Sequence, residues 1–356
     1  MNNFLLCINC KNLLKKFDIN LPSFTHYNFE LIDKKNTFYI CNKCNLISKQ
    51  NLDKKNFNFF NSKGYFFTNH NQKSFNNKKN YLKHEAQFEF LKKKNFLFKG
   101  IKVLDIGCNN GELISLIKKD IKDSICKGYD KNPFLKKSLI KKKLFFDYRK
   151  NKIKKFDLIV MSHSLIYFKD LKKIIEQLMN NLSKNGIIFI ENSNFSSSPF
   201  YLLMSDQFYF FTPFFLQRLF LKYEFFSELF YPSILKGNFV MLFSKNKNIK
   251  NSLKEKYDFY KSIRYLNFIK NFLISRKIKK FFIFGTTVKA AFLNFYLGKK
   301  VESFVDESLV KNSFLNKNVI HPNVLKKDDF ILVPLKDKKN ILKKLNTKYK
   351  GKFSIL

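Results

Sequence analysis

The stretch VLDIGCNNGEL, residues 103–113, indicates how the chain folds. Its apolar run contains Asp105. Two glycines, Gly107 and Gly111, follow this run, and a segment with helical spacing begins after them. At the carboxyl end of a strand in a parallel sheet, such a turn lets the backbone approach a ligand. The free N–H groups at the start of the next helix also favour binding there.

The spacing of these glycines differs from that of dinucleotide-binding proteins. Those proteins have G-x-G-x-x-G and bind a pyrophosphate, whereas this turn is G-x-x-x-G preceded by an acid. A carboxylate at that place disfavours a phosphate and favours a cationic or zwitterionic ligand. Asp130, in GYDKNP, ends the next predicted strand, where an acid can accept two hydrogen bonds from a ribose. The pattern predicts a nucleoside ligand with a charged amino-acid tail. The glycine turn alone also fits a generic Rossmann-like loop.

Strands and helices alternate around this turn, which is typical of a parallel, doubly wound α/β sheet with covered faces. The run FVMLFS, at 239–244, is predicted to close the sheet as an antiparallel edge strand. The periodicity predicts strands at 101–106, 125–129, 156–161 and 186–191, and helices at 75–98, 111–119, 133–142 and 169–182.

A smaller α/β unit is predicted after a polar linker at 244–256, which leads into a helix. Its expected elements are strands at 280–285, 301–306 and 329–335 and a helix at 286–297. We therefore expect three domains, with bounds 1–60, 61–246 and 247–356.

Four of the six cysteines form two CxxC pairs, Cys7 with Cys10 and Cys41 with Cys44. Each pair can occupy a tight turn with both sulfurs facing one point, and two such turns make a tetrahedral thiolate site that suits zinc. A filled shell leaves no position for a substrate, so the predicted role is structural. Disulfides are the alternative, which the lack of an apparent secretion signal disfavours. The remaining two cysteines are interpreted as buried bystanders.

The net charge of +41 first suggests a nucleic-acid partner. The cations are nearly all Lys, however, and Arg, which suits specific phosphate and base recognition, occurs at only four positions. Lys, Asn, Phe and Ile dominate every segment, so we interpret the charge as a compositional bias and nucleic acid as an unlikely partner. A basic surface still favours an acidic small substrate such as a diphosphate. We find no membrane span and expect a cytoplasmic protein, and the sequence favours no particular oligomeric state.

VLDIGCNNGEL together with GYDKNP resembles the first two cofactor motifs of class I S-adenosylmethionine-dependent methyltransferases. By this resemblance, Gly107 and Gly111 approach the methionine part of the cofactor. Asp105 orders the loop near the ammonium group, and Asp130 holds the ribose. The family often has a glycine at the position of Asn109, and Asn tolerates a left-handed backbone better than most residues.

The stretch FDYRKNKIKKFDLIVMSHSLIYF, at 146–168, resembles the next part of that family. The resemblance places Asp147 near the adenine amino group, and Ser162 and His163 near the floor of the cofactor site. LMNNLSKNGIIFIEN, at 178–192, resembles the helix, glycine turn and fifth strand.

Over nearly its whole length the chain resembles the zinc-binding sugar C-methyltransferases. They have a four-cysteine module before the methyltransferase sheet and a second α/β domain after it, and they act on nucleoside-diphosphate keto-deoxysugars. The resemblance implies a Rossmann-like methyltransferase sheet with an N-terminal four-cysteine zinc-binding module and a smaller C-terminal α/β domain. Its C-terminal part is carried by FFIFGTTVKAAFLNFYLGKKVESFVDES, which also fits a second Rossmann unit used only for packing.

The expected catalytic signature is altered in this chain. The family tends to have Tyr-x-Glu-His after the fifth strand, where this chain has Met-Ser-Asp206-Gln207. Gln207 cannot act as a base. The histidine often found after the fourth strand falls at Ser164, one position after His163. The candidates for catalysis are therefore His163, Asp206 and Tyr209. Each has a structural alternative, as a loop hydrogen bond, a turn cap and a core residue respectively.

Three functions remain open. The first is methylation of a sugar nucleotide, on carbon or on oxygen or nitrogen. The second is methylation of RNA by an enzyme with a zinc module, and the third is a non-catalytic relative that binds cofactor or sugar.

Overall fold

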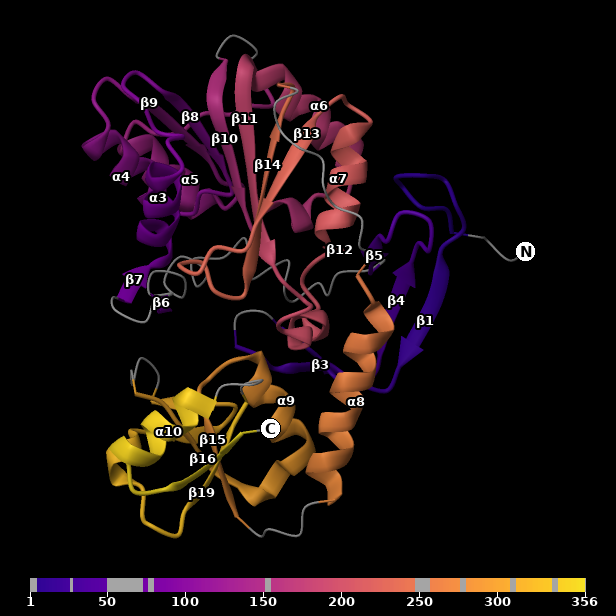
Figure 1. Cartoon of the computed structure of the whole chain (residues 1–356), viewed down its shortest axis with the longest axis vertical. Helices are drawn as coiled ribbons and strands as arrows, with labels where there is room; N and C mark the ends of the chain where they lie inside the picture. The colour runs from indigo at the N-terminus through magenta and orange to yellow at the C-terminus, as the bar shows by residue number, and fades with distance from the viewer. Residues whose placement is uncertain are drawn as a thin grey trace. The chain divides into compact units, whose positions relative to one another are not determined.

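The chain forms two compact units, each built from three segments of sequence (Figure 1). The first comprises Met1–Phe17, Phe38–Asn194 and Gln207–Tyr257. The second comprises Asp18–Thr37, Phe195–Asp206 and Asp258–Leu356. The computed structural model describes residues 5–25, 28–49, 73–75, 80–150, 155–246, 257–275, 280–307, 312–334 and 339–355.

The centre of the first unit is a six-stranded sheet in the order β13-β14-β11-β10-β8-β9. Strands β9, β8, β10 and β11 are parallel, and β14 and β13 are antiparallel to their neighbours. A single parallel bridge from Gly128 to Phe145 continues the sheet beyond β9. The strands are β8 Lys102–Ile106, β9 Ile125–Tyr129, β10 Phe156–Ser162, β11 Leu182–Ser193, β13 Phe226–Phe230 and β14 Asn238–Ser244.

Helices cover both faces of this sheet because successive strand residues point to opposite sides. Val103 packs in a buried cluster with α3, α4 and α5, whereas Leu104 packs in another with α6 and α7. Figure 1 shows these two groups of helices on either side of the strands. The helices are α3 Lys83–Lys93, α4 Glu112–Asp120, α5 Pro133–Lys141, α6 Leu171–Asn181 and α7 Pro213–Leu221. The doubly wound arrangement predicted from the alternating pattern is confirmed.

Two predictions for this unit are wrong. The helix expected at 75–98 is limited to Lys83–Lys93, because Asn80–Leu82 forms strand β7 and pairs with β6, Lys73–Phe75. The N–H of Leu82 donates to the Glu85 carboxylate at 2.8 Å, which fixes the start of the helix. The strand FVMLFS is antiparallel as predicted, but it is not at the edge, since β13 pairs with its outer side.

The cysteine-bearing segment pairs with a strand that comes much later in the chain. β5 (Ile47–Ser48) lies between β4 (Asn36–Ile40) and β12 (Tyr209–Phe210), and β1 (Lys15–Ile19) pairs on the far side of β4. Residues 50–60 of the predicted N-terminal domain and residues 247–256 of the predicted linker lie outside the described residues.

The second unit contains a six-stranded sheet in the order β17-β18-β16-β15-β19-β20, parallel except for β17. After β15 the chain first adds strands on one side of it, β16 and then β18, and later adds β19 and β20 on the other side, as in doubly wound folds. The strands are β15 Phe281–Phe284, β16 Val301–Val305, β17 Ser313–Phe314, β18 Lys317–Ile320, β19 Phe330–Val333 and β20 Lys352–Ile355. The helices are α8 Phe259–Ser275, α9 Val288–Leu297 and α10 Lys339–Lys348.

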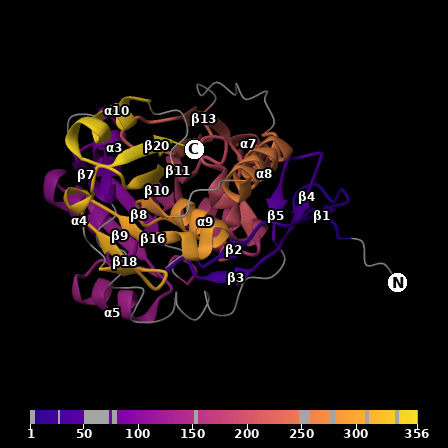
Figure 2. The ribbon, with the colours of Figure 1, turned by 90° about the horizontal axis from the view of Figure 1, so that it is seen from below.

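The alternation predicted for this unit is confirmed for β15, α9, β16 and β19, and the structure adds β17, β18, α10 and β20. α10 packs beside β20 (Figure 2). The hairpin of β2 (Ser23–Phe24) and β3 (Leu31–Asp33) also belongs to this unit. Among the helices that the structure describes, none is long and apolar enough to cross a membrane.

Candidate active site and cysteine cluster

The glycine turn connects β8 to α4 at the carboxyl edge of the first sheet. Gly107, Asn109 and Gly111 all have left-handed backbones, with φ of +80°, +53° and +78°. Asp130, just after β9, accepts a hydrogen bond from the N–H of Asn109 at 3.1 Å. Asp105 lies on β8 directly before the turn and is buried. The structure therefore brings together these five residues that the sequence singled out.

Packing as well as the backbone angle requires glycine at position 107, and at position 111 packing adds a tight fit to the effect of the backbone angle. A Cβ at Gly107 would lie 2.5 Å from the Cβ of Ser164, and one at Gly111 would lie 3.0 Å from Leu139 Cδ2. Ser164 also donates from its Oγ to the carbonyl oxygen of Ile106 at 2.6 Å. The turn after β8 is thus packed against the turn after β10.

The two acids of this turn give it an unusual charge balance. Burial raises the pKa of Asp105 to about 8, with a further rise from nearby Asp130 and a partial offset by the charge of Lys83. Burial also raises the pKa of Asp130 to about 6, against the effect of hydrogen bonds from backbone N–H groups. A positively charged ligand would stabilise both carboxylates in their ionised form.

A buried acceptor in the same turn supports this interpretation. Asn109 Oδ1 is buried and has no hydrogen-bond partner among the described residues. Buried polar atoms are nearly always hydrogen-bonded, so this oxygen is suited to a donor on a ligand. An ammonium group would donate hydrogen bonds to these acceptors, the two carboxylates and the amide oxygen of Asn109.

Asp147, predicted to lie near an adenine amino group, makes a two-pronged ion pair with Arg149. Arg149 donates from Nε and Nη2 to the two carboxylate oxygens, each at 2.8 Å, and its guanidinium lies over the ring of Tyr129. The hydrogen bonds from Arg149 lower the pKa of Asp147. Both oxygens of Asp147 thus already have a strong donor.

His163 and Ser162 lie at the end of β10, beside a buried acid that the sequence analysis missed. Glu191, on β11, is fully buried and accepts a hydrogen bond from Ser162 Oγ at 2.7 Å. His163 Nε2 lies 3.7 Å from the other carboxylate oxygen of Glu191. The signal that could have found Glu191 is its place at the end of the apolar run IIFI, which parallels Asp130 after its own strand.

The other two predicted catalytic residues are both buried. Tyr209 donates from its hydroxyl to the carbonyl oxygen of Lys169 at 2.7 Å and stacks on Phe211. Burial raises the pKa of Tyr209 to about 12. Asp206 belongs to the second compact unit, whereas His163 and Tyr209 belong to the first.

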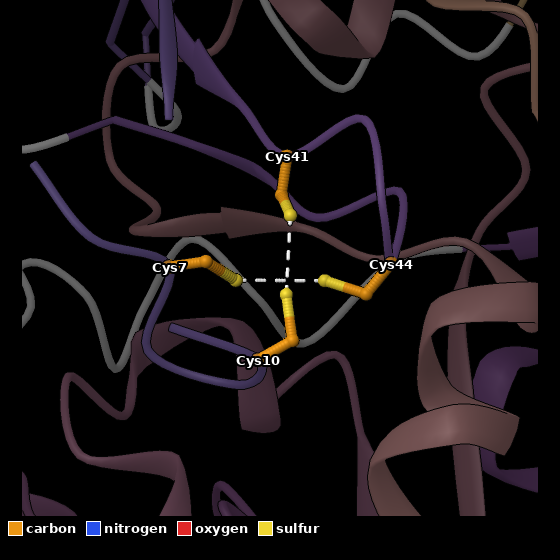
Figure 3. A group of neighbouring side chains, drawn as sticks. All are labelled: Cys7, Cys10, Cys41 and Cys44. Carbon is orange, nitrogen blue, oxygen red and sulfur yellow. Dashed lines mark hydrogen bonds between the residues drawn. The ribbon is translucent and has the colours of Figure 1, made fainter. Parts of the chain in front are cut away.

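The four predicted metal ligands, Cys7, Cys10, Cys41 and Cys44, converge on one point (Figure 3). Each CxxC turn is closed by a hydrogen bond to the carbonyl of its first cysteine, from the N–H of Lys11 in one and Asn45 in the other. Lys11 and Asn45 also share a left-handed backbone. The two turns therefore have the same local geometry.

The cysteine sulfurs have the separations that a tetrahedral metal site requires. The Sγ atoms of Cys7 and Cys44 are 3.5 Å apart, those of Cys10 and Cys41 are 3.4 Å apart, and all four lie within 4.8 Å of one another. A zinc ion with bonds of about 2.3 Å would place its ligands about 3.8 Å apart. The hydrogen bond between Cys7 and Cys44 lowers the pKa of Cys7 and raises that of Cys44, and burial raises the pKa of Cys41. Four sulfurs with these separations fit zinc.

A comparison with protein families identifies the central part of the chain. Residues 77–227 match the family model described as a methyltransferase domain. This range contains the glycine turn, Asp130, His163 and Glu191. Among curated proteins, none matches the chain.

Several solved structures are similar to the chain over less than half of its length. A TehB-like SAM-dependent methyltransferase from Corynebacterium glutamicum is 19% identical, with a TM-score of 0.34 over 46% of this chain and 88% of that one. A SAM-dependent methyltransferase from Archaeoglobus fulgidus is 18% identical, with a TM-score of 0.37 over 46% of this chain and 94% of that one. At such identities and TM-scores these similarities indicate no substrate.

The residues matched by the family model include both acids and both glycines of the candidate cofactor site. The match covers residues 77–227, which leaves the cysteine cluster outside it and includes only Phe195–Asp206 of the second unit. The turn after β8 and the acid after β9 stand where a parallel α/β sheet binds its ligand. Residues 77–227 match a methyltransferase domain and contribute to a Rossmann-like α/β sheet, and the chain is an enzyme that uses S-adenosylmethionine.

Proposed function

We propose that this enzyme transfers a methyl group to a carbon atom of a nucleoside-diphosphate keto-deoxysugar. The observation that carries the proposal is the combination of three parts in one chain. These are the methyltransferase domain, the convergent cluster of four cysteines and a second doubly wound sheet. The same parts in the same order carry the resemblance to the sugar C-methyltransferases.

The proposed cofactor site is the turn after β8. Asp105 and Asn109 Oδ1 would face the ammonium group, and Asp130 would accept hydrogen bonds from the ribose. When bound, S-adenosylmethionine supplies a methyl group to a nucleophile, and the carbon–sulfur electron pair stays on the sulfur. We propose that Asp147 accepts a hydrogen bond from the adenine amino group. The amino group would have to share this carboxylate with Arg149.

Carbon methylation next to a ketone requires a base. We propose His163 for this role, because it follows β10, where Val160 pairs with Asp105 of the cofactor turn. The imidazole would accept the proton of the carbon, and the electron pair of that C–H bond would remain as an enolate. Tyr209 remains a candidate donor to the enolate oxygen, for which its hydroxyl would have to leave the carbonyl oxygen of Lys169. Asp206 stays a further candidate from the sequence.

The four-cysteine cluster is proposed to hold a structural zinc ion. Cys7, Cys41 and Cys44 belong to the same buried cluster as Tyr209 and Phe215. Metal binding at that place would stabilise the core of the methyltransferase unit as well as the two turns.

The proposal is tested by incubating the enzyme with S-adenosylmethionine and single thymidine- or guanosine-diphosphate keto-deoxysugars. Mass spectrometry should detect a methylated sugar nucleotide and S-adenosylhomocysteine in equal amounts. His163→Asn is the matched variant, and it should retain cofactor binding while it loses the product. Production of S-adenosylhomocysteine with RNA but with no sugar nucleotide would contradict the proposal.

The net charge of +41 is the observation that favours an RNA substrate instead. Phosphate contacts would make RNA binding weaken steeply between 50 and 200 mM salt, by about 10³-fold or more for six contacts. A flat salt dependence would exclude this second function. Any methylated product would exclude a non-catalytic relative.

A further inference from the structure

Glu191 is a buried carboxylate that collects hydrogen bonds from three other elements. Gln87 of α3 donates to Oε2 at 2.6 Å, and Ser162 of β10 donates to the same oxygen at 2.7 Å. Asn238 of β14 donates to Oε1 at 2.6 Å. No part of the Glu191 side chain is exposed. Such a set of donors fixes the position of the carboxylate.

The charges around this carboxylate keep it ionised. Burial by itself would raise the pKa of Glu191, but the charge of Lys83, the contact with His163 and the hydrogen bond from Gln87 hold it well below its usual range. The other acid that senses this charge is Asp105, whose pKa Glu191 helps to raise. Glu191 is therefore ionised at neutral pH, and its charge acts on Asp105 beside the cofactor turn.

His163 is held against Glu191 by both its backbone and its side chain. The N–H of His163 donates to the carbonyl oxygen of Glu191 at 2.9 Å, and its Nε2 lies 3.7 Å from Oε1. The backbone of His163 has a φ of +51°, which costs free energy for a residue with a side chain. The imidazole is 26% exposed, whereas the carboxylate behind it is 0% exposed. Strain of this kind is concentrated at functional sites.

We propose that Glu191 is the positioning residue for His163 in the methyl-transfer reaction, and that the pair replaces the histidine missing at Gln207. This inference rests on the proposed function, which requires a base. With the Nε2 proton directed at Glu191, proton acceptance falls to Nδ1. The proton of the sugar carbon would move to Nδ1, the C–H electron pair would stay on the sugar as an enolate, and Glu191 would stay ionised beside the imidazolium.

A purely structural role for Glu191 makes a different prediction. A carboxylate that only joined α3, β10 and β14 would affect stability, and its loss in a folded variant would leave both the titration of His163 and kcat unchanged. A carboxylate that faces the imidazole should raise the pH at which His163 titrates, since an opposite charge at this distance shifts a pKa by about one unit or more. The charges of Lys83 and Asp105 are the same whichever role Glu191 has, so they do not affect this comparison.

The test follows the histidine side chains by NMR as the pH is varied, on the full chain without substrate. The chain has five histidines, and His163→Asn assigns the signal by its loss. Glu191→Gln should lower the titration midpoint of His163 by about one pH unit. Ser162→Ala, which removes a hydrogen bond to Glu191 but leaves its charge, should leave the midpoint within about 0.3 units. An unchanged midpoint in folded Glu191→Gln protein would overturn the inference.

Two further measurements keep the test informative. If Glu191→Gln fails to fold, Glu191→Asp keeps the charge and should keep the midpoint, while Asn238→Ala reports the cost of losing one donor. With the sugar substrate, Glu191→Gln should lower kcat about 10²-fold or more and change the KM for S-adenosylmethionine much less, since Glu191 acts on the cofactor turn only through the charge that Asp105 senses. The NMR titration needs no sugar, so its failure is distinct from failure to find a methylated product.

Discussion

Replacing Asp105 by Asn should stabilise the ligand-free protein and weaken its binding of S-adenosylmethionine. In the folded protein the carboxyl group keeps its proton up to about pH 8, whereas its usual pKa is 3.8. Between these values folding takes up one proton, so the free energy of unfolding falls by about 1.4 kcal/mol for each unit of rising pH. Asparagine has nearly the same shape and does not ionise, so this loss is absent from the variant.

The size of the effect follows from the two pKa values. From pH 5 to pH 7 the advantage of Asp105→Asn over the native protein should grow by about 2.7 kcal/mol. The assay is urea unfolding at pH 5, 6 and 7. Asp123→Asn is the matched control, because its side chain is 59% exposed and should give the native pH dependence.

The Asp105→Asn substitution should weaken cofactor binding, although it stabilises the ligand-free protein. A cationic ligand favours the ionised carboxylate, so binding of S-adenosylmethionine to the native protein near pH 7 should release a proton. Calorimetry in two buffers of different ionisation enthalpy measures this release. Asp105→Asn should release fewer protons and bind about tenfold more weakly, a loss of ~1.4 kcal/mol. The reasoning is refuted if Asp105→Asn and Asp123→Asn have the same pH dependence of stability.

Two other substitutions test the cysteine cluster and the glycine turn. Cys41→Ser should reduce bound zinc from about one ion per chain to none and lower the melting temperature. Cys126→Ser is the control and should keep the metal. Elemental analysis measures the zinc content of both variants, and equal contents would refute the site. Gly107→Ala should destabilise the protein by about 2–4 kcal/mol in urea unfolding, because its Cβ would meet Ser164 at 2.5 Å. Gly100→Ala shares the left-handed backbone but meets nothing within 4 Å, so it should cost less, and equal costs would contradict the packing argument.

Local spacing in the sequence was enough to predict the parts of the site that lie close together in the chain. The turn from Asp105 to Gly111 and the two CxxC turns are defined by residues within a few positions of each other, and short-range geometry follows from short-range sequence. Asp130 could also be predicted, because it ends the strand that follows the turn. The alternation of strands and helices predicted the sheet class for the same reason.

Tertiary structure alone decided which distant residues meet. Glu191 is 104 positions from Gln87, 29 from Ser162 and 47 from Asn238, and no periodicity relates these residues. The order of the strands placed β13 outside β14 and brought the turn of His163 against Gly107. Hydrophobic patterns specify which face of an element is buried but not which element buries it, so contacts between distant segments follow only from packing of the whole unit.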